Sequence, residues 1–136
     1  MLRILIVEDS AAMRAYVRSA LEGVPGLGDD LEIAEASSGF DALRLLPRST
    51  HDLVITDINM PDINGLELIR FVRANNHLER VAVLVISTQA SERDRARSMA
   101  LGADDFLGKP FTPEQLRAAV GKCVAARRSQ QSQGSG

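Results

Sequence analysis

The chain has 136 residues, of which 45% are hydrophobic and 25% are charged, values typical of a single globular domain with its own core. Its 16 basic residues nearly balance 18 acidic ones, which argues against binding of nucleic acid through the phosphates. The single cysteine excludes an internal disulfide and a multi-thiolate zinc site, and no apolar run approaches the roughly 20 residues of a membrane span, so we expect a soluble, cytoplasmic domain.

Short apolar runs typical of strands alternate with amphipathic helical patterns along the chain. The run from Val81 to Ile86 is the most apolar, so we expect a central strand that is buried on both faces. The five predicted strands are Leu2 to Val7, Leu31 to Ala36, Asp52 to Thr56, Val81 to Ile86 and Asp105 to Gly108.

Residues that favour helix starts precede the helical patterns. Ser38 with Asp41, and Thr112 with Gln115, have the spacing at which a hydroxyl caps the first turn of a helix. Cys123 falls on the apolar stripe of the last helix, so we expect it in the core. The helical patterns follow Ser10, run from Ser38 to Leu46, from Gly65 to Ala74 and from Ser91 to Leu101, and start again at Thr112.

This strand–helix alternation, repeated five times, predicts an α/β fold: a doubly wound, five-stranded parallel sheet with five helices on its two faces. We expect the domain to span residues 1–126. Residues 127–136 (RRSQQSQGSG) are polar and of low complexity, and we expect them to form a disordered C-terminal tail.

Charged and polar side chains stand where the predicted strands end. They are Glu8 and Asp9 after the first strand, Asp57 after the third, Ser87 after the fourth and Lys109 after the fifth. Because the carboxyl ends of parallel strands share one edge, where such folds bind ligands, we expect these side chains to converge.

Three neighbouring carboxylates need protons or a cation, since two like charges about 4 Å apart cost roughly 4 kcal/mol at an effective dielectric constant near 20. With oxygen ligands alone and no Cys or His at these strand ends, the pattern favours Mg²⁺ over zinc. Mg²⁺ and Lys109 would neutralise charge on a transferring phosphoryl group, and a carboxylate can itself be the nucleophile. Asp57, at the centre of the predicted sheet, is the best candidate.

The chain resembles the receiver domain of bacterial two-component response regulators, chemotaxis type. The resemblance covers about residues 2–125 and rests on Glu8-Asp9, Asp57-Ile58-Asn59-Met60-Pro61, Gly65, Ser87-Thr88 and Lys109-Pro110-Phe111. It implies a flavodoxin-like topology and a phosphorylation-activated signalling domain. Such a domain is not an enzyme beyond catalysing its own phosphorylation and dephosphorylation, and its phosphoryl donor would be a sensor histidine kinase.

The resemblance implies roles for the acidic residues. Asp57 would accept the phosphoryl group from a phosphohistidine. Asp9, Asp57 and the backbone carbonyl of Asn59 would bind Mg²⁺, with Glu8 acting through a metal-bound water. Glu8 stands where the chemotaxis type has Asp, which lengthens its reach.

The resemblance also implies a switch. Lys109, joined to Pro110 by a cis peptide bond, would pair with a phosphoryl oxygen, and Ser87 would hydrogen-bond the phosphoryl group. Phe106 would be the aromatic switch residue, which couples the site to a protein-binding face on the fourth helix, fifth strand and fifth helix. Asn59 and Gln89 would tune hydrolysis of the aspartyl phosphate.

Three alternatives use related residues. A phosphatase of the haloacid dehalogenase type needs an acid two residues after the nucleophile, where this chain has Asn59. A flavodoxin-type carrier needs a phosphate-cradling loop in place of Glu8-Asp9. A receiver-like interaction module that works without phosphorylation normally lacks an acid or the lysine; it is the main alternative.

No output domain follows in this chain, so we expect the signal to leave through an unknown downstream protein. We expect no direct contact with nucleic acid or membrane, and a monomer or weak dimer.

Overall fold

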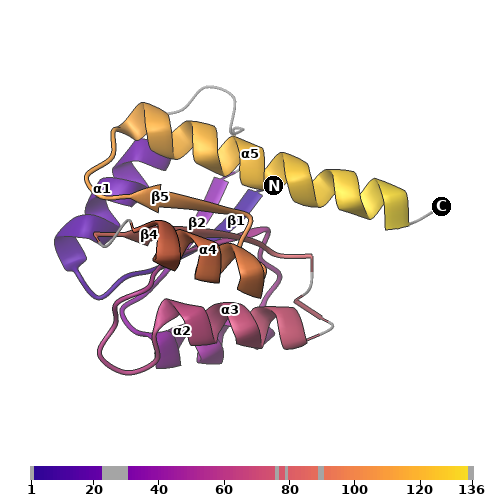
Figure 1. Ribbon diagram of the computed structural model, residues 1–136, viewed down its shortest axis with the longest axis horizontal. Helices are drawn as coiled ribbons and strands as arrows, with labels where there is room; N and C mark the ends of the chain where they lie inside the picture. Colours follow the sequence, from indigo (N-terminus) through magenta and orange to yellow (C-terminus); the bar gives the residue numbers. More distant parts are fainter. Residues whose placement is uncertain (1, 23–30, 76, 79, 89–90, 135–136) are drawn as a thin grey trace.

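The computed structural model describes residues 2–22, 31–75, 77–78, 80–88 and 91–134, with side chains described as far as residue 127. Five parallel strands form one sheet in the order β2-β1-β3-β4-β5, which is the order of flavodoxin-like folds. The doubly wound sheet predicted from the sequence is confirmed (Figure 1). The elements are β1 Leu2–Val7, α1 Ala11–Glu22, β2 Leu31–Ala36, α2 Gly39–Leu45, the short 3₁₀ helix η1 Leu46–Arg48, β3 Leu53–Asp57, α3 Gly65–Ala74, β4 Ala82–Ser87, α4 Glu92–Leu101, β5 Asp105–Gly108 and α5 Pro113–Gly134.

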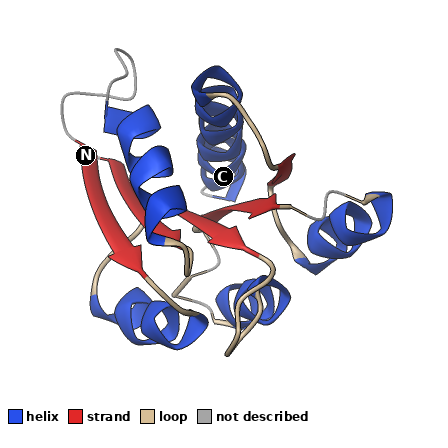
Figure 2. Cartoon of the chain, turned by 90° about the vertical axis from the view of Figure 1, so that its left-hand side faces the viewer, coloured by secondary structure: helices blue, strands red, loops and turns tan. Residues whose placement is uncertain are grey.

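Two apolar layers hold the helices to the sheet, because alternate residues of a strand point to opposite faces. One layer packs α2, α3 and the β5 residue Phe106 against one face, and the other packs α1 and α5 against the opposite face (Figure 2). All six residues of β4 are buried, and this strand lies beside the central strand β3. Cys123 is fully buried, as predicted, and burial raises the pKa of its thiol to about 12.

The predicted helix caps are present. Ser38 Oγ accepts a hydrogen bond from the Asp41 backbone N–H at 3.1 Å. Thr112 and Gln115 form a reciprocal capping box, in which each side chain accepts from the other residue's backbone N–H, at 2.9 and 3.1 Å. Gly102 ends α4 with φ at 114°, a left-handed conformation that favours glycine.

The backbone of α5 is helical as far as Gly134, whereas the polar, low-complexity sequence from residue 127 onward predicts disorder. One reason is that the chain has no proline after Pro113 to interrupt the helix. A second is that Arg127 Nε donates to Asp104 Oδ1 at 2.9 Å, which ties this part of the helix to the start of β5. A domain boundary at residue 126 stays a prediction.

Within the part of the chain that the structure describes, every helix is too short or too polar to cross a bilayer.

Candidate functional site

The strand register brings the predicted residues to one edge of the sheet. Val7 pairs with Thr56, so the residues that follow, Glu8 and Asp57, leave β1 and β3 at the same level. On the other side of β3, Asp57 pairs with Ile86 of β4. The next β4 residue, Ser87, accepts a hydrogen bond through its carbonyl from the Lys109 N–H at 2.7 Å.

Glu8, Asp9 and Asp57 form a compact acidic cluster, and each offers a carboxylate oxygen within 4.8 Å of the other two. Glu8 and Asp57 are buried, whereas Asp9 is exposed. Burial, followed by the hydrogen bond with Asp57, raises the pKa of Glu8 to about 7. Burial therefore disfavours the fully ionised form of the cluster.

Lys109 partly compensates this charge. Its Nζ lies 2.8 Å from Asp57 Oδ2 and 3.0 Å from Glu8 Oε1, and its side chain is only 8% exposed. Burial acts to lower the pKa of Lys109, but the hydrogen bonds to Asp57 and Glu8 outweigh it, so the pKa is raised. Lys109-Pro110 is a cis peptide bond, as the resemblance implies.

The residues present fit a magnesium ion. When all three carboxylates are ionised, they and the Lys109 ammonium leave an excess of two negative charges, which one divalent cation balances. Glu8 Oε2 is buried and has no hydrogen-bond partner among the residues that the structure describes. The donors are all carboxylate oxygens, the ligands that a hard cation such as Mg²⁺ prefers.

The Asp57 carboxylate is held at both oxygens. Oδ1 accepts from the Asn59 backbone N–H at 2.9 Å, and Oδ2 faces Lys109. The loop after β3 folds back closely, with the Gly65 N–H donating to the Ile58 carbonyl at 2.9 Å. A Cβ at residue 65 would overlap the Asp57 carbonyl oxygen, so this approach requires glycine.

The other predicted residues have different surroundings. Ser87 is fully buried at the end of β4. Phe106 is buried in the apolar layer that contains α2 and α3. Asn59 is exposed, and Gln89 lies outside the described residues.

Sequence reasoning missed two α1 residues that contact backbone at this edge. Arg14 Nη1 donates to the Glu8 carbonyl at 2.6 Å, and Tyr16 Oη donates to the Phe111 carbonyl at 2.7 Å. In the sequence both look like ordinary exposed positions of an amphipathic helix, so no local signal distinguishes them.

Known proteins resemble this chain in sequence. Residues 4–121 match the family model described as response regulator receiver domain. A chemotaxis protein CheY homolog of Campylobacter jejuni is 33% identical over 117 residues, which cover 85% of this chain and 87% of that protein. A probable transcriptional regulatory protein of Picosynechococcus is 40% identical over 136 residues, 95% of this chain. The sensor histidine kinase TmoS of Ectopseudomonas mendocina is 33% identical over 125 residues, 92% of this chain. The chain spans only 50% of the Picosynechococcus protein and 12% of TmoS.

Solved structures resemble it in fold as well. The chemotaxis response regulator CheY4 of Vibrio cholerae has a TM-score of 0.81 at 29% identity, covering 90% of this chain and 98% of that one. A putative response regulator of Chloroflexus aurantiacus has a TM-score of 0.83 at 27% identity, covering 91% and 98%.

Proposed function

The chain belongs to the response regulator receiver domain family, and from this premise we propose that Asp57 is its phosphoryl acceptor. The family places it among the signalling domains of two-component systems rather than among classical enzymes. The observation that carries the assignment is Lys109 Nζ between Asp57 Oδ2 and Glu8 Oε1, beside Asp9 in the same cluster.

In the proposed reaction, an Asp57 carboxylate oxygen attacks the phosphorus of a phosphohistidine on a sensor histidine kinase. A P–O bond forms, the P–N bond breaks, and the imidazole leaves. The contacts of Asn59 and Lys109 orient the carboxylate before the reaction. Lys109 is also placed to pair with the added phosphoryl charge.

Asp9, Asp57 and the Asn59 carbonyl would bind Mg²⁺, and Glu8 would act through a bound water. When bound, the ion neutralises negative charge on the phosphoryl oxygens. The orphaned Glu8 Oε2 and the unbalanced charge of the cluster support this ligand set.

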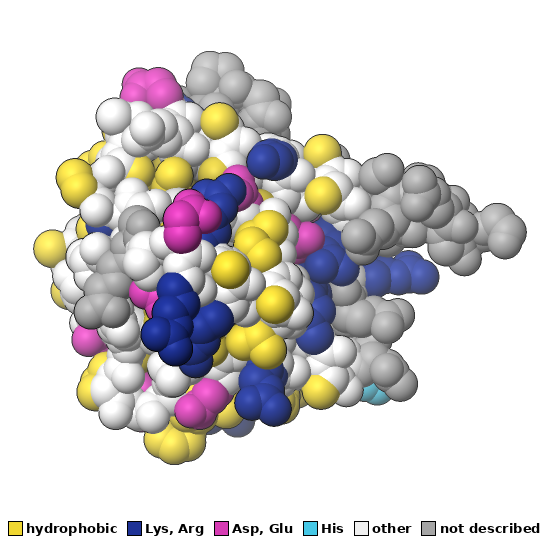
Figure 3. Space-filling model, in the orientation of Figure 1, with side chains coloured by type: hydrophobic (Ala, Val, Ile, Leu, Met, Phe, Trp, Pro, Cys, Tyr) yellow, Lys and Arg dark blue, Asp and Glu magenta, His cyan; other side chains and the backbone are white. Residues whose placement is uncertain are grey.

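The switch is part of the same proposal. Ser87, which is buried at the end of β4 next to Lys109, would hydrogen-bond the phosphoryl group. Phe106 would then change its packing in the apolar layer that contains α2 and α3. Asn59 and Gln89 would tune the lifetime of the phosphorylated state. The signal would leave through α4, β5 and α5 to a downstream protein. Figure 3 shows the face that carries α4, where basic, acidic and apolar side chains are interspersed, as suits a protein partner. We place the domain in the cytoplasm, as a monomer or weak dimer without direct contact with nucleic acid.

Acetyl phosphate with Mg²⁺ tests the acceptor. Intact-mass measurement is expected to show one labile phosphoryl group on the wild-type protein and none on Asp57→Ala. Asp41→Ala, which removes a half-buried carboxylate paired with Arg44, is the matched control and is expected to be phosphorylated normally. Equal phosphorylation of Asp57→Ala would refute the assignment. A folded wild-type protein that gains no phosphoryl group would favour the phosphorylation-independent interaction module.

A further inference from the structure

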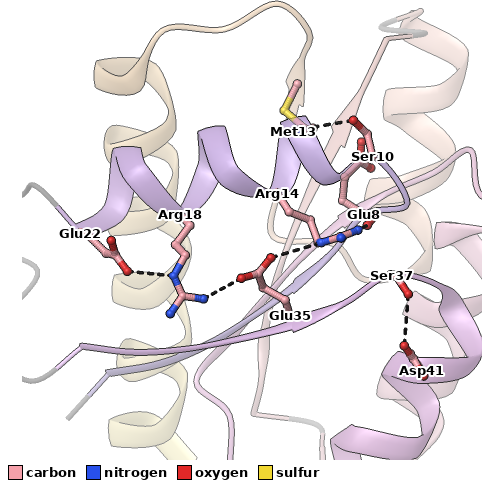
Figure 4. A network of polar contacts seen from close by, with 9 residues as sticks. All are labelled: Glu8, Ser10, Met13, Arg14, Arg18, Glu22, Glu35, Ser37 and Asp41. Carbon is pink, nitrogen blue, oxygen red and sulfur yellow. Dashed lines mark hydrogen bonds and ion pairs between the residues drawn. The ribbon is translucent and has the colours of Figure 1, made fainter.

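Arg14 links helix α1 to the backbone of the acidic cluster. Its Nη1 donates to the Glu8 carbonyl at 2.6 Å, and its Nε donates to Glu35 Oε1 on β2 at 3.2 Å (Figure 4). The Arg14 side chain is 19% exposed, so these contacts are only partly screened by solvent.

Hydrogen bonds hold both backbone groups of Glu8, its N–H and its carbonyl. The Glu8 N–H donates to the carbonyl of Ala36 at 3.0 Å, and Ala36 directly follows Glu35, the residue that Arg14 also binds. The two backbone groups of Glu8 are therefore fixed from β2, one directly and one through Arg14.

The carbonyl that Arg14 binds belongs to the peptide that joins Glu8 to Asp9. A peptide group is planar, so its orientation constrains the backbone of both residues that it joins. Both carry carboxylates of the cluster. A change in the orientation of this peptide therefore alters the backbone from which both carboxylates extend.

We propose that Arg14, held by Glu35, is a positioning residue that sets the geometry of the Glu8–Asp9 pair and thereby the Mg²⁺ affinity of the site. This inference rests on the proposed function, because it assigns Arg14 a part in the same metal site. Arg14 touches neither the ion nor the phosphoryl group and acts through the Glu8 carbonyl.

Arg18 offers a matched control on the same helix. Its Nη1 binds the other oxygen of Glu35 at 2.7 Å and its Nε binds Glu22 at 2.9 Å, both shown in Figure 4. Arg18 thus shares the charge and the Glu35 partner of Arg14, and the structure gives it no contact with the Glu8 backbone.

The test is calorimetric titration of metal-free wild-type protein, Arg14→Met and Arg18→Met with Mg²⁺, with urea unfolding to confirm that each is folded. We expect Mg²⁺ binding to weaken about 10-fold in Arg14→Met, since loss of a group that orients metal ligands costs 10–100-fold in affinity. Arg18→Met is expected to bind like the wild type. Amide hydrogen exchange at Glu8, measured without metal, is expected to speed up only in Arg14→Met.

Wild-type affinity in a folded Arg14→Met, or equal weakening in both variants, would overturn the inference and leave the proposed function standing. A folded wild-type protein that binds no Mg²⁺ would instead overturn the proposed function. If Arg14→Met does not fold, the same titration of Arg14→Lys tests the inference. One ammonium is too compact to reach both the Glu8 carbonyl and the Glu35 carboxylate. Weaker Mg²⁺ binding by Arg14→Lys supports the inference, and unchanged binding refutes it.

Discussion

Replacing Asp9 by Asn separates charge repulsion in the acidic cluster from metal binding. Asp9 is exposed, and its carboxylate lies within 4.8 Å of those of Glu8 and Asp57. Two full charges at that distance repel by about 3.5 kcal/mol at a dielectric constant of 20 and by about 0.9 kcal/mol in water. Solvent exposure places Asp9 near the lower value, and Lys109, which pairs with Glu8 and Asp57, offsets part of the two repulsions. We therefore expect Asp9→Asn to raise the free energy of unfolding by about 1 kcal/mol in EDTA at a pH above the Glu8 pKa of about 7, where both neighbouring carboxylates are ionised.

Magnesium is expected to reverse the order of stability. At a Mg²⁺ concentration 100 times the dissociation constant, the wild-type protein gains about 2.7 kcal/mol. Asp9→Asn is expected to gain little, because an amide replaces a carboxylate that we propose as a ligand of the ion. The wild type is then the more stable of the two.

Urea unfolding followed by circular dichroism, in EDTA and in Mg²⁺, measures both effects. Glu114→Gln is the control, since it removes one negative charge from a side chain that is 76% exposed and distant in sequence from the cluster. Its stability difference from the wild type is expected to be the same in both buffers. A destabilised Asp9→Asn in EDTA, or an undiminished gain in Mg²⁺, would refute the reasoning.

Two further predictions concern stability. Gly65→Ala is expected to cost about 3 kcal/mol in chemical unfolding, because its methyl group would overlap the Asp57 carbonyl. At Gly121, by contrast, no atom of the described residues lies within 4 Å of an added Cβ, so Gly121→Ala is expected to stabilise α5 by about 1 kcal/mol. Similar effects at both positions would contradict this prediction. Burial, followed by the charge of Arg3, lowers the pKa of His51, with Asp52 and Glu32 opposing. As the pH falls below about 6.5, the unfolded chain therefore binds a proton that the folded protein resists, and stability falls. His51→Gln is expected to flatten the pH dependence of the melting temperature between pH 7 and about pH 5; an unchanged slope would contradict this assignment.

Features with local causes could be predicted from the sequence. The caps at Ser38 and Thr112 depend on residues three positions apart, and both are present. The convergence of Glu8, Asp57 and Lys109 also follows from simple rules, because strand ends of a parallel sheet share one edge.

Contacts between distant segments could not be predicted in this way. Arg73 of α3 donates to the carbonyls of Gly102 and Val81 and to Asp104 Oδ2, at 2.9, 2.7 and 3.0 Å. Burial lowers the pKa of Arg73 to about 10. In the sequence Arg73 is one more charge on an amphipathic helix, and Arg14 is indistinguishable from Arg18. Their partners follow from tertiary packing, which charge patterns along a helix do not encode.

Helix α4 is anchored differently from α3. The fully buried side chain of α4 is Ser98, whose hydroxyl donates to the Asp94 carbonyl of the same helix at 2.9 Å. In α3, by contrast, Leu66, Leu68, Ile69 and Val72 are buried, each stabilising the packed state by about 1.5–3 kcal/mol. Separating α4 from the sheet would therefore expose far less apolar surface than separating α3 from it. We therefore expect α4 to shift more readily than α3 while the five strands stay in place.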